Sequence, residues 1–401
     1  MTFAERADMT EQPGNNNIPI DDPLVGSSPV TVDLPPLYCP IAPVEHRRTE
    51  QFLDRGIGWM RRFGFCSDEE QRAHALRTDS HDWFPRMVPD ASDERLQILV
   101  DWCYLMYVFD DVYCDDGPTS RDVGKLVDFT SRLLRAMEAP ETGPMPGDSP
   151  FAAPIRDLML RARACTSPTV IRRWTQAQRA WMYGCAWQTS FRAGPQVLTL
   201  NDYASMRPLV GCSSATLTAI ELATGEVPSE EINAAPVQAL IEAAALTSIW
   251  DNDLFSYGRE TWLAQQTSHA PTTPDNLIDL LSHERRLSLH DAIAEAVSLR
   301  NRCMYFFVQL RNQLAPTAGP ELRRYLDSLG NVIRRNLDAG LTMDRYTNPD
   351  GRHPNAVAVT ATLIDECPVQ DRAALELPTT SWWWKHLRTK RADEGLLDDR
   401  P

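Results

Sequence analysis

The stretch that decides the fold is APVQALIEAAALTSIWDNDLFSYGRETW, residues 235–262. Apolar residues recur in it every three to four positions, which is the period of an α-helix, and few charged residues interrupt residues 235–250. A helix that is apolar on most sides must lie among other elements of structure. We therefore expect residues 235–262 to form a helix in the interior of the protein.

The same helical period recurs along most of the chain, whereas the alternation typical of strands is scarce. Loop-like separators rich in Pro and Gly lie between the periodic segments, as in EAPETGPMPGDSP before Phe151. Ser92 is a suitable N-cap for the segment that starts at Asp93. The further expected helices are 93–113, 121–138, 152–165, 168–192, 201–224, 287–315 and 319–341. The sequence thus predicts an all-α protein, a single bundle of about ten or more helices.

Both ends of the chain differ in composition from this helical body. Residues 1–45 are rich in Pro, Asn, Asp and Ser, which predicts a disordered leader. Residues 46–347 form the predicted helical domain. Residues 348–401 form a tail that is either disordered or partly ordered as a lid. The block SWWWKH at 381–386 is compatible with a lid, an interface or a tail packed on the body.

Composition argues against several classes of function. The 401 residues carry a formal net charge of −15 at pH 7, which argues against nucleic acid or an anionic membrane as a partner. No window approaches about 18 consecutive apolar residues, so no membrane-spanning helix is expected, and no signal peptide is evident. The nine cysteines are scattered singly, which is typical of reduced thiols and predicts a cytoplasmic protein.

An acidic cluster, FDDVYCDD at 109–116, follows a long apolar run. On an α-helix, Asp111 and Asp115 share a face. Unpaired carboxylates beside apolar residues are costly, and a divalent metal would compensate them. Mg²⁺ prefers carboxylate oxygen and leaves coordination sites for substrate phosphates. Asp110, Asp111 and Asp115 are therefore candidate magnesium ligands, with a solvated acidic helix end as the alternative.

A second polar pattern lies inside the stretch that decides the fold. Asn252, Ser256 and Glu260 are spaced four residues apart, so on a helix they form one stripe. An amide, a hydroxyl and a carboxylate that present oxygen to the same point suit a six-coordinate Mg²⁺. A stripe that merely faces solvent is the alternative, but the apolar turns before it favour burial.

Together these two motifs resemble those of class I terpene cyclases. NDLFSYGRE resembles the second metal-binding motif of that family, and FDDVYCDD resembles its aspartate-rich motif. Arg207 lies 45 residues before Asn252, about where the family has an arginine that senses the diphosphate, and Arg345–Tyr346 resembles its terminal Arg–Tyr pair. The resemblance covers about residues 37–347. It implies the class I terpenoid synthase fold, with helices around a deep apolar active-site cavity.

The resemblance also implies an activity and a role for each motif. Three Mg²⁺ ions would bridge the two motifs and the diphosphate of a linear isoprenoid substrate, whose ionisation yields a carbocation that closes into rings. Gly211 stands where the family has a helix-breaking glycine, whose break would expose a carbonyl to the cavity, and Val210 replaces the usual acidic linker. The residues implied to bind the diphosphate are Arg207, Arg259, Arg345 and Tyr346.

Within the aspartate-rich motif, the spacing departs from the common form. Cys114 stands where the family often has a further acid, and Asp115 follows one residue later. We therefore expect Asp110 as the first metal ligand and Asp115 as the second. Tyr107 should share a face with Asp110 and could stabilise cations, with Phe84, Trp181 and Trp187 as looser candidates. Ordinary core packing is the alternative for each of these aromatic residues.

Several substrates and functions stay open. Farnesyl diphosphate (C15) ranks first, because it is the most common substrate of the family and because Met106 and Tyr107 would shorten a pocket. A methylated C10 diphosphate, as used by 2-methylisoborneol synthase, and a C20 diphosphate follow. A chain-elongating prenyltransferase would carry two aspartate-rich motifs, and a non-catalytic helical scaffold would not need the intact charges. Similar enzymes include dimers, so a homodimer is an alternative to a monomer.

Overall fold

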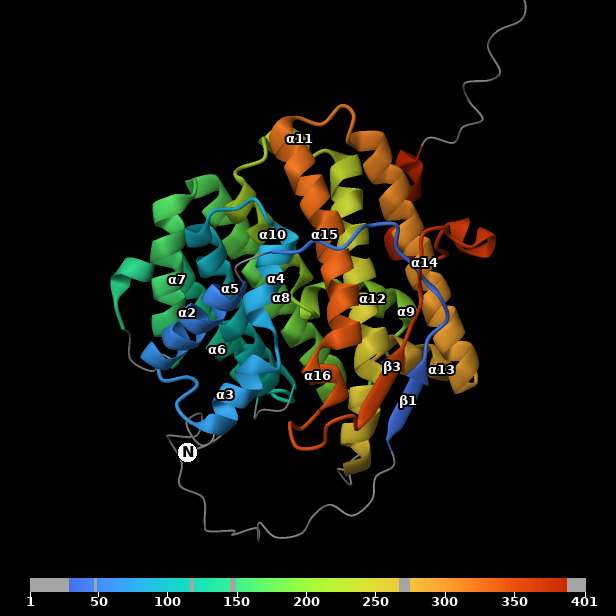
Figure 1. The fold of residues 1–401 in the computed structure, drawn as a ribbon, viewed down its shortest axis with the longest axis horizontal. Coiled ribbons are helices and arrows are strands. Elements are labelled where there is room, and N and C mark those ends of the chain that lie inside the picture. Colours follow the sequence, from blue (N-terminus) through green and yellow to red (C-terminus); the bar gives the residue numbers. More distant parts are fainter. Residues whose placement is uncertain (1–28, 47–48, 116–118, 145–148, 267–274, 388–401) are drawn as a thin grey trace, which may run out of the picture.

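Helix α12 (Ala235–Gln266) runs through the middle of the molecule, with α14 (Leu289–Leu314) and α15 (Pro320–Thr342) packed against it (Figure 1). The computed structural model describes residues 29–46, 49–115, 119–144, 149–266 and 275–387. Most residues of the first half of α12 are buried, as its apolar composition predicted. The predicted all-α fold is confirmed.

The remaining helices pack around this central group. The first half of the chain contributes α2 (Thr49–Arg62), α3 (Glu69–Leu76), α4 (Ser80–Met87), α5 (Asp93–Phe109), α6 (Val123–Glu138), α7 (Ala152–Cys165) and α8 (Pro168–Ala193). The second half contributes α9 (Leu200–Val210), α10 (Ser213–Thr224), α11 (Ser229–Ile232), α13 (Leu277–Arg285) and α16 (Asp344–Thr347). The bounds of α7 are those that the sequence predicted, and the side chain of Ser92 caps α5 as expected.

Two predicted helices are interrupted. The segment 93–113 is α-helical only to Phe109 and continues as a π-helical turn, Asp110–Asp115. The segment 201–224 is divided into α9 and α10, because Cys212 adopts a left-handed backbone conformation with φ 60°. Both interruptions lie at the candidate site described below.

Two segments from opposite halves of the chain, 30–38 and 357–364, lie side by side, and both contact α12 (Figure 1). Two parallel strand pairs join them, β1 (Val30–Asp33) with β3 (Val357–Thr360) and β2 (Leu37–Tyr38) with β4 (Leu363–Ile364). Ordered structure therefore begins before residue 46, inside the segment predicted as a disordered leader, whereas residues 1–28 lie outside the described part. Local composition could not indicate these strands, because the partner of each one lies at the other end of the chain.

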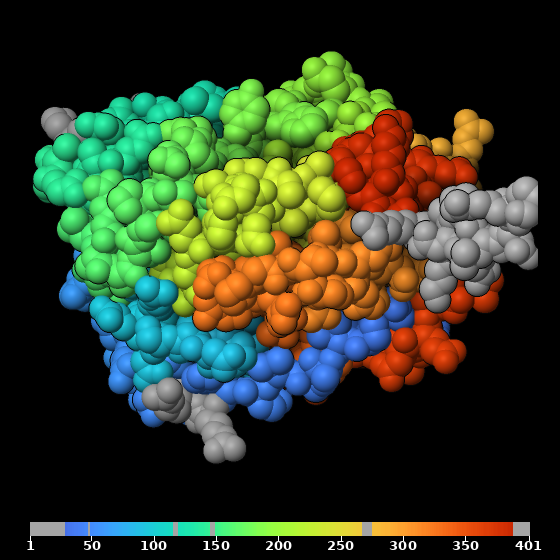
Figure 2. All heavy atoms as spheres, turned by 90° about the horizontal axis from the view of Figure 1, so that it is seen from above, coloured from blue at the N-terminus to red at the C-terminus, as the bar shows by residue number. Residues whose placement is uncertain are grey.

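The C-terminal tail is packed on the helical body, as Figure 2 shows for the red end of the chain. Trp383 is 2% exposed, and its Nε1 donates a hydrogen bond to Oε2 of Glu242 on α12 at 2.7 Å. The ring of Trp384 lies 5.0 Å from that of Phe306 on α14, measured between centroids. Of the three interpretations of SWWWKH, the structure shows the packed tail.

The described part of the chain contains no helix that is long and apolar enough to span a bilayer. The nine cysteines are free thiols, six of them buried and three half-buried.

Candidate active site

A cavity of about 930 Å³ lies between α5, α8, the α9–α10 break, α12 and α15. Part of its wall is apolar and aromatic, with Phe84, Met87, Trp102, Met106, Trp181 and Ile249. The wall also contains nearly all the residues that the sequence singled out: Tyr107, Asp110, Arg207, Gly211, Asn252, Ser256, Arg259, Glu260, Arg345 and Tyr346. Asp111 is not in the wall, and the side chain of Asp115 lies outside the described residues. The fold thus brings four distant motifs to one cavity.

The predicted stripe of α12 faces this cavity. Asn252 Oδ1 accepts a hydrogen bond from Nη2 of Arg207 at 3.1 Å, and Asn252 Nδ2 donates one to the hydroxyl of Tyr346 at 2.8 Å. Ser256 Oγ donates to Oε1 of Glu260 at 2.6 Å. Because α12 is a regular helix here, the four-residue spacing places all three side chains on one side, as predicted.

Glu260 is also held by a residue that sequence analysis missed. Asn276, the N-cap of α13, donates from Nδ2 to Oε2 of Glu260 and to the carbonyl of Asp253, both at 2.9 Å. Burial raises the pKa of Glu260, and the hydrogen bond from Ser256 opposes this effect. The charge of Arg207 also lowers this pKa, but among the described residues Glu260 has no ion pair. Hydrogen bonds orient this carboxylate, which suits a metal ligand.

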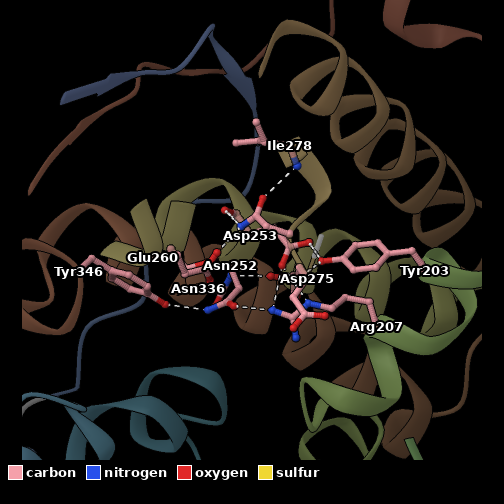
Figure 3. A network of polar contacts seen from close by, with 12 residues as sticks. Tyr203, Arg207, Asn252, Asp253, Glu260, Asp275, Ile278, Asn336 and Tyr346 are labelled. Carbon is pink, nitrogen blue, oxygen red and sulfur yellow. Dashed lines mark hydrogen bonds and ion pairs between the residues drawn. The ribbon is translucent and has the colours of Figure 1, made fainter. Parts of the chain in front are cut away.

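Arg207 is positioned by an acid to which the sequence had assigned no role. Asp253 Oδ1 lies 2.8 Å from Nη2 of Arg207, and the hydroxyl of Tyr203 donates to Asp253 Oδ2 at 2.7 Å (Figure 3). Burial raises the pKa of Asp253, against the effect of Arg207. Burial also works against the charge of Arg207, but Asp253 raises the pKa of Arg207 well above its ordinary value. Asp253 follows Asn252 directly, so it projects about 100° further around α12, toward α9.

Asp111 is already paired within the protein. Its two oxygens accept hydrogen bonds from the two Nη atoms of Arg345, at 2.7 and 3.1 Å, and His74 Nε2 lies 2.8 Å from Oδ2. Burial alone would raise the pKa of Asp111, but Arg345 and His74 hold it well below its usual range. In this structure Asp111 positions Arg345, and its assignment to the metal site stays a prediction. No motif in the sequence singles out His74.

The π-helical turn gives Asp110 and Asp111 different surroundings. Its hydrogen bonds join residues five apart, so Asp110 and the backbone of Asp115 come to the same side. An α-helical period would pair Asp111 with Asp115 instead, whereas the motif spacing favours Asp110 and Asp115. Asp110 lies in the cavity wall while Asp111 turns to Arg345.

Gly211 lies between α9 and α10, as expected. A Cβ at this position would lie 2.0 Å from Cδ1 of Ile249 on α12, so the close approach of the two elements requires glycine. Two carbonyls at this break have partners: that of Val210 accepts a hydrogen bond from Nε1 of Trp181 at 2.8 Å, and that of Arg207 accepts one from the Gly211 amide at 2.9 Å. The exposed carbonyl that the family resemblance implies stays a prediction.

The aromatic candidates divide into two groups. Tyr107 lies in the cavity wall, with the guanidinium carbon of Arg345 5.2 Å from the centroid of its ring. Phe84 and Trp181 also line the cavity, whereas Trp187 does not and packs near Phe191. Three of the four aromatic residues therefore face the space that a substrate would occupy.

Comparisons with known proteins decide the family. Residues 101–305 match the family model described as terpene synthase family 2, C-terminal metal binding. Phomopsene synthase from Allokutzneria albata is 37% identical over 359 residues, which cover 89% of this chain and 98% of that protein. The chain belongs to terpene synthase family 2.

Other relatives of this terpene synthase agree with the assignment. The diterpene cyclase DtcycA of a Streptomyces species is 30% identical over 91% of this chain and 99% of its own. The crystal structure of the SVS_A2 protein, from ancestral sequence reconstruction, matches with a TM-score of 0.73 and 34% identity, over 88% of this chain and 99% of that one. The structure of 2-methylisoborneol synthase from Streptomyces coelicolor A3(2), with Mg²⁺ and 2-fluoroneryl diphosphate, matches with a TM-score of 0.67 over 77% of this chain and 96% of that one. At 18% identity it shows a shared fold.

This terpene synthase is a class I terpene cyclase, a lyase that acts on isoprenoid diphosphates, and the predicted fold is confirmed. The matched model describes a metal-binding domain, so a divalent metal belongs to its chemistry.

The residues of this terpene synthase fit such a metal. Asp110 reaches the cavity from one side, and the oxygens of Asn252, Ser256 and Glu260 reach it from the other. These are hard oxygen donors of the kind that Mg²⁺ prefers. Among the described residues, no three carboxylate, histidine or cysteine side chains meet at one point.

Proposed function

We propose that this terpene cyclase acts on geranylgeranyl diphosphate, a C20 substrate, and releases diphosphate as it forms a cyclic terpene. The observation that carries the proposal is the depth of the apolar cavity beyond Asp110. Farnesyl diphosphate, which the sequence ranked first, is the second candidate.

The depth of the cavity can be followed along α5. Met106 and Tyr107 precede Asp110 by about one turn, where the sequence predicts that their bulk shortens the pocket. Trp102 and Cys103 also line the cavity, and eight residues of α-helix span about 12 Å. Substrate carbons therefore have room past Met106 and Tyr107, which favours the longer chain. The name of the diterpene cyclase DtcycA points the same way.

The metal ligands that we propose are Asp110, Asn252, Ser256 and Glu260, with Asp115 as a further ligand from the π-helical turn. The family resemblance implies three Mg²⁺ ions. When bound, Mg²⁺ acts as a Lewis acid that stabilises the charge of the departing diphosphate. The protein's part is to aim these oxygens, and Asn276 does so for Glu260.

Four residues are proposed to bind the diphosphate through charge-assisted hydrogen bonds: Arg207, Arg259, Arg345 and Tyr346. Asp253 fixes Arg207, and Asp111 fixes Arg345. Arg259 lines the cavity, and its Nε is buried without a hydrogen-bond partner in the described part of the chain. A phosphate oxygen would satisfy this donor, because the guanidinium offers several N–H groups in a fixed fork.

The apolar wall would shape the reaction after the diphosphate leaves. Tyr107, Trp181 and Phe84 present aromatic rings to the cavity, and each ring can stabilise a nearby cation by about 0.5–2 kcal/mol. Gly211 keeps the α9–α10 break against Ile249, so we assign it a role in shaping the wall. The homodimer and the cytoplasmic location stay predictions.

The deciding experiment offers the purified protein geranyl, 2-methylgeranyl, farnesyl and geranylgeranyl diphosphates, each with Mg²⁺ or with EDTA. Products are identified by gas chromatography and mass spectrometry. We expect a cyclic C20 product that forms only with Mg²⁺. A cyclic product from farnesyl diphosphate alone would contradict the proposed chain length.

A further inference from the structure

A third arginine lies near Arg259 and Arg345 at the edge of the active site. Arg77 is the C-cap of α3, one turn beyond His74, whose Nε2 lies 2.8 Å from Asp111. Asp111 in turn binds Arg345, so the end of α3 is one side chain away from a proposed diphosphate ligand. Burial, followed by repulsion from Arg345 and then Arg259, lowers the pKa of Arg77.

The acids nearest to Arg77 already have other partners. Asp111 is bound by Arg345 and His74, as described above. Asp350 Oδ2 lies 2.8 Å from Nδ1 of His353, and its Oδ1 accepts hydrogen bonds from two backbone amides in the same loop. Within the ranges that the structure describes, the guanidinium of Arg77 has no ion pair and no hydrogen bond.

This local excess of positive charge is unusual for this chain. The protein carries a net charge of −15, and a half-buried guanidinium close to two like charges is costly when the neighbouring acids bind other partners. Arg259 likewise has a buried Nε without a partner in the described residues. An oxyanion placed between these side chains would satisfy both, because guanidinium groups match phosphate in charge and geometry.

The position of Arg77 is set by the loop that follows α16. Gly351 in this loop has φ 74°, and a Cβ on it would lie 2.2 Å from Nη1 of Arg77. A side chain at position 351 would therefore displace the guanidinium from its present position. The same segment of chain carries Arg345 and Tyr346 on α16, so the loop brings Arg77 and these two residues to one place.

We propose that Arg77 is a further diphosphate-binding residue, which together with Arg259 and Arg345 forms a rim of three arginines around the phosphate that is farthest from the isoprenoid chain. Arg77 does not line the cavity itself, so it contacts the end of the ligand that points out of the cavity. The inference rests on the proposed function of the site.

The test measures the binding of inorganic diphosphate in the presence of Mg²⁺ by isothermal titration calorimetry, which needs no turnover. We expect Arg77→Gln to weaken binding about tenfold, the loss of one charge-assisted hydrogen bond. Arg77→Lys should recover part of the affinity, because it keeps the charge without the planar fork.

Arg72 offers a matched control on the same helix. It is 40% exposed and lies 3.6 Å from Glu69, an exposed acid. Arg72→Gln removes the same charge from α3 at a distance from the proposed rim, so we expect a change of less than about twofold in affinity. Circular dichroism and thermal unfolding without ligand confirm that each variant is folded.

Gly351→Ala provides an independent test of position. The added methyl group would displace the guanidinium of Arg77, so it should weaken diphosphate binding in the wild-type background. In the Arg77→Gln background it should have little further effect, because the group it displaces is gone.

The outcomes separate the two proposals. If the wild type binds diphosphate and folded Arg77→Gln binds it equally well, the role of Arg77 is overturned while the active site stands. If Gly351→Ala weakens binding as much in the Arg77→Gln background as in the wild type, the loop acts without Arg77 and the proposal also fails. If the wild type does not bind diphosphate with Mg²⁺, the proposed diphosphate site itself is wrong, and so is the proposed role of Arg77.

Discussion

Asn252, Ser256 and Glu260 lie within a regular helix of 32 residues, whereas Asp110 lies in a π-helical turn of 6 residues at the end of α5. The two groups face the same cavity and present the same kind of oxygen donor. On α12 every side chain follows the period of the helix, so spacing in the sequence translates directly into position. At the end of α5 the period changes, and adjacent acids acquire different partners. In a regular helix, the spacing of a motif is enough to predict which side chains share a face. In a π-helical turn, the α-helical spacing rule does not predict which acid faces the cavity.

The largest expected effect concerns the α12 stripe. Glu260→Ala and Asn252→Ala should each reduce turnover about 10³-fold, because metal stabilisation of the leaving group is worth several kcal/mol. Steady-state kinetics with geranylgeranyl and farnesyl diphosphates, and unfolding curves as a check of the fold, would measure this. Near-normal turnover in either variant would contradict the metal site on α12.

The second effect compares the ion pairs that anchor the two helices. Asp251 of α12 binds Arg300, and both side chains are 0% exposed, whereas Asp101 of α5 binds Arg161, which is 32% exposed. Asp251→Ala should lower the free energy of unfolding by about 3–5 kcal/mol, because it leaves a buried charge unpaired. Asp101→Ala should cost only about 1–2 kcal/mol, because water can reach Arg161. Urea denaturation at pH 7 measures both free energies of unfolding. Equal decreases in the two variants would contradict the expected difference between the two ion pairs.

The stability of the protein should depend on pH through Asp101, the buried acid of α5 that binds Arg161. Burial, against the effect of Arg161, raises the pKa of Asp101 from 3.8 to about 6. The folded state therefore binds more protons than the unfolded state between these values, so this contribution to stability is present below about pH 4 and is lost as the pH rises through about 6. Between pH 4 and 7 the wild type should lose up to about 3 kcal/mol more stability than Asp101→Asn. Urea denaturation of both proteins across this pH range measures the difference, and two parallel stability profiles would contradict the prediction.

The neighbouring acids of the π-helical turn should respond differently. Asp110→Asn should lower kcat about 10²-fold and raise the Mg²⁺ concentration needed for half-maximal rate, since Asp110 faces the cavity. Asp111→Asn should mainly raise KM, because it releases Arg345 without removing a ligand. Kinetics over a range of Mg²⁺ concentrations separate the two. A larger Mg²⁺ requirement in Asp111→Asn than in Asp110→Asn would return Asp111 to the metal site.

The smallest effect concerns the aromatic residues of the cavity wall. Tyr107→Ala should change the proportions of cyclic products more than the total rate, because a ring stabilises a passing cation by about 0.5–2 kcal/mol. Trp187→Phe serves as the control, since Trp187 does not line the cavity. An unchanged product profile in Tyr107→Ala would leave Tyr107 with a packing role only.

Much of the fold and of the site could be predicted because it depends on local periodicity. The bounds of α7, the cap at Ser92 and the break at Gly211 agree with the structure. The stripe on α12 could be placed because helix geometry alone sets the spacing of its side chains. The pairing of Asp253 with Arg207 and of Asp111 with His74 could not be predicted, because no local rule joins residues on different helices.

By itself, the sequence determined that the chain is a helical bundle with two motifs of oxygen donors suited to Mg²⁺. The hydrophobic period and the chemistry of the residues are properties of each segment alone. Tertiary structure decided which partner each acid meets, how deep the cavity is, and that the strands within 30–38 and 357–364 pair beside α12. These features arise from contacts between segments that are distant in the chain, and their energies depend on burial and on the partner that each charge meets.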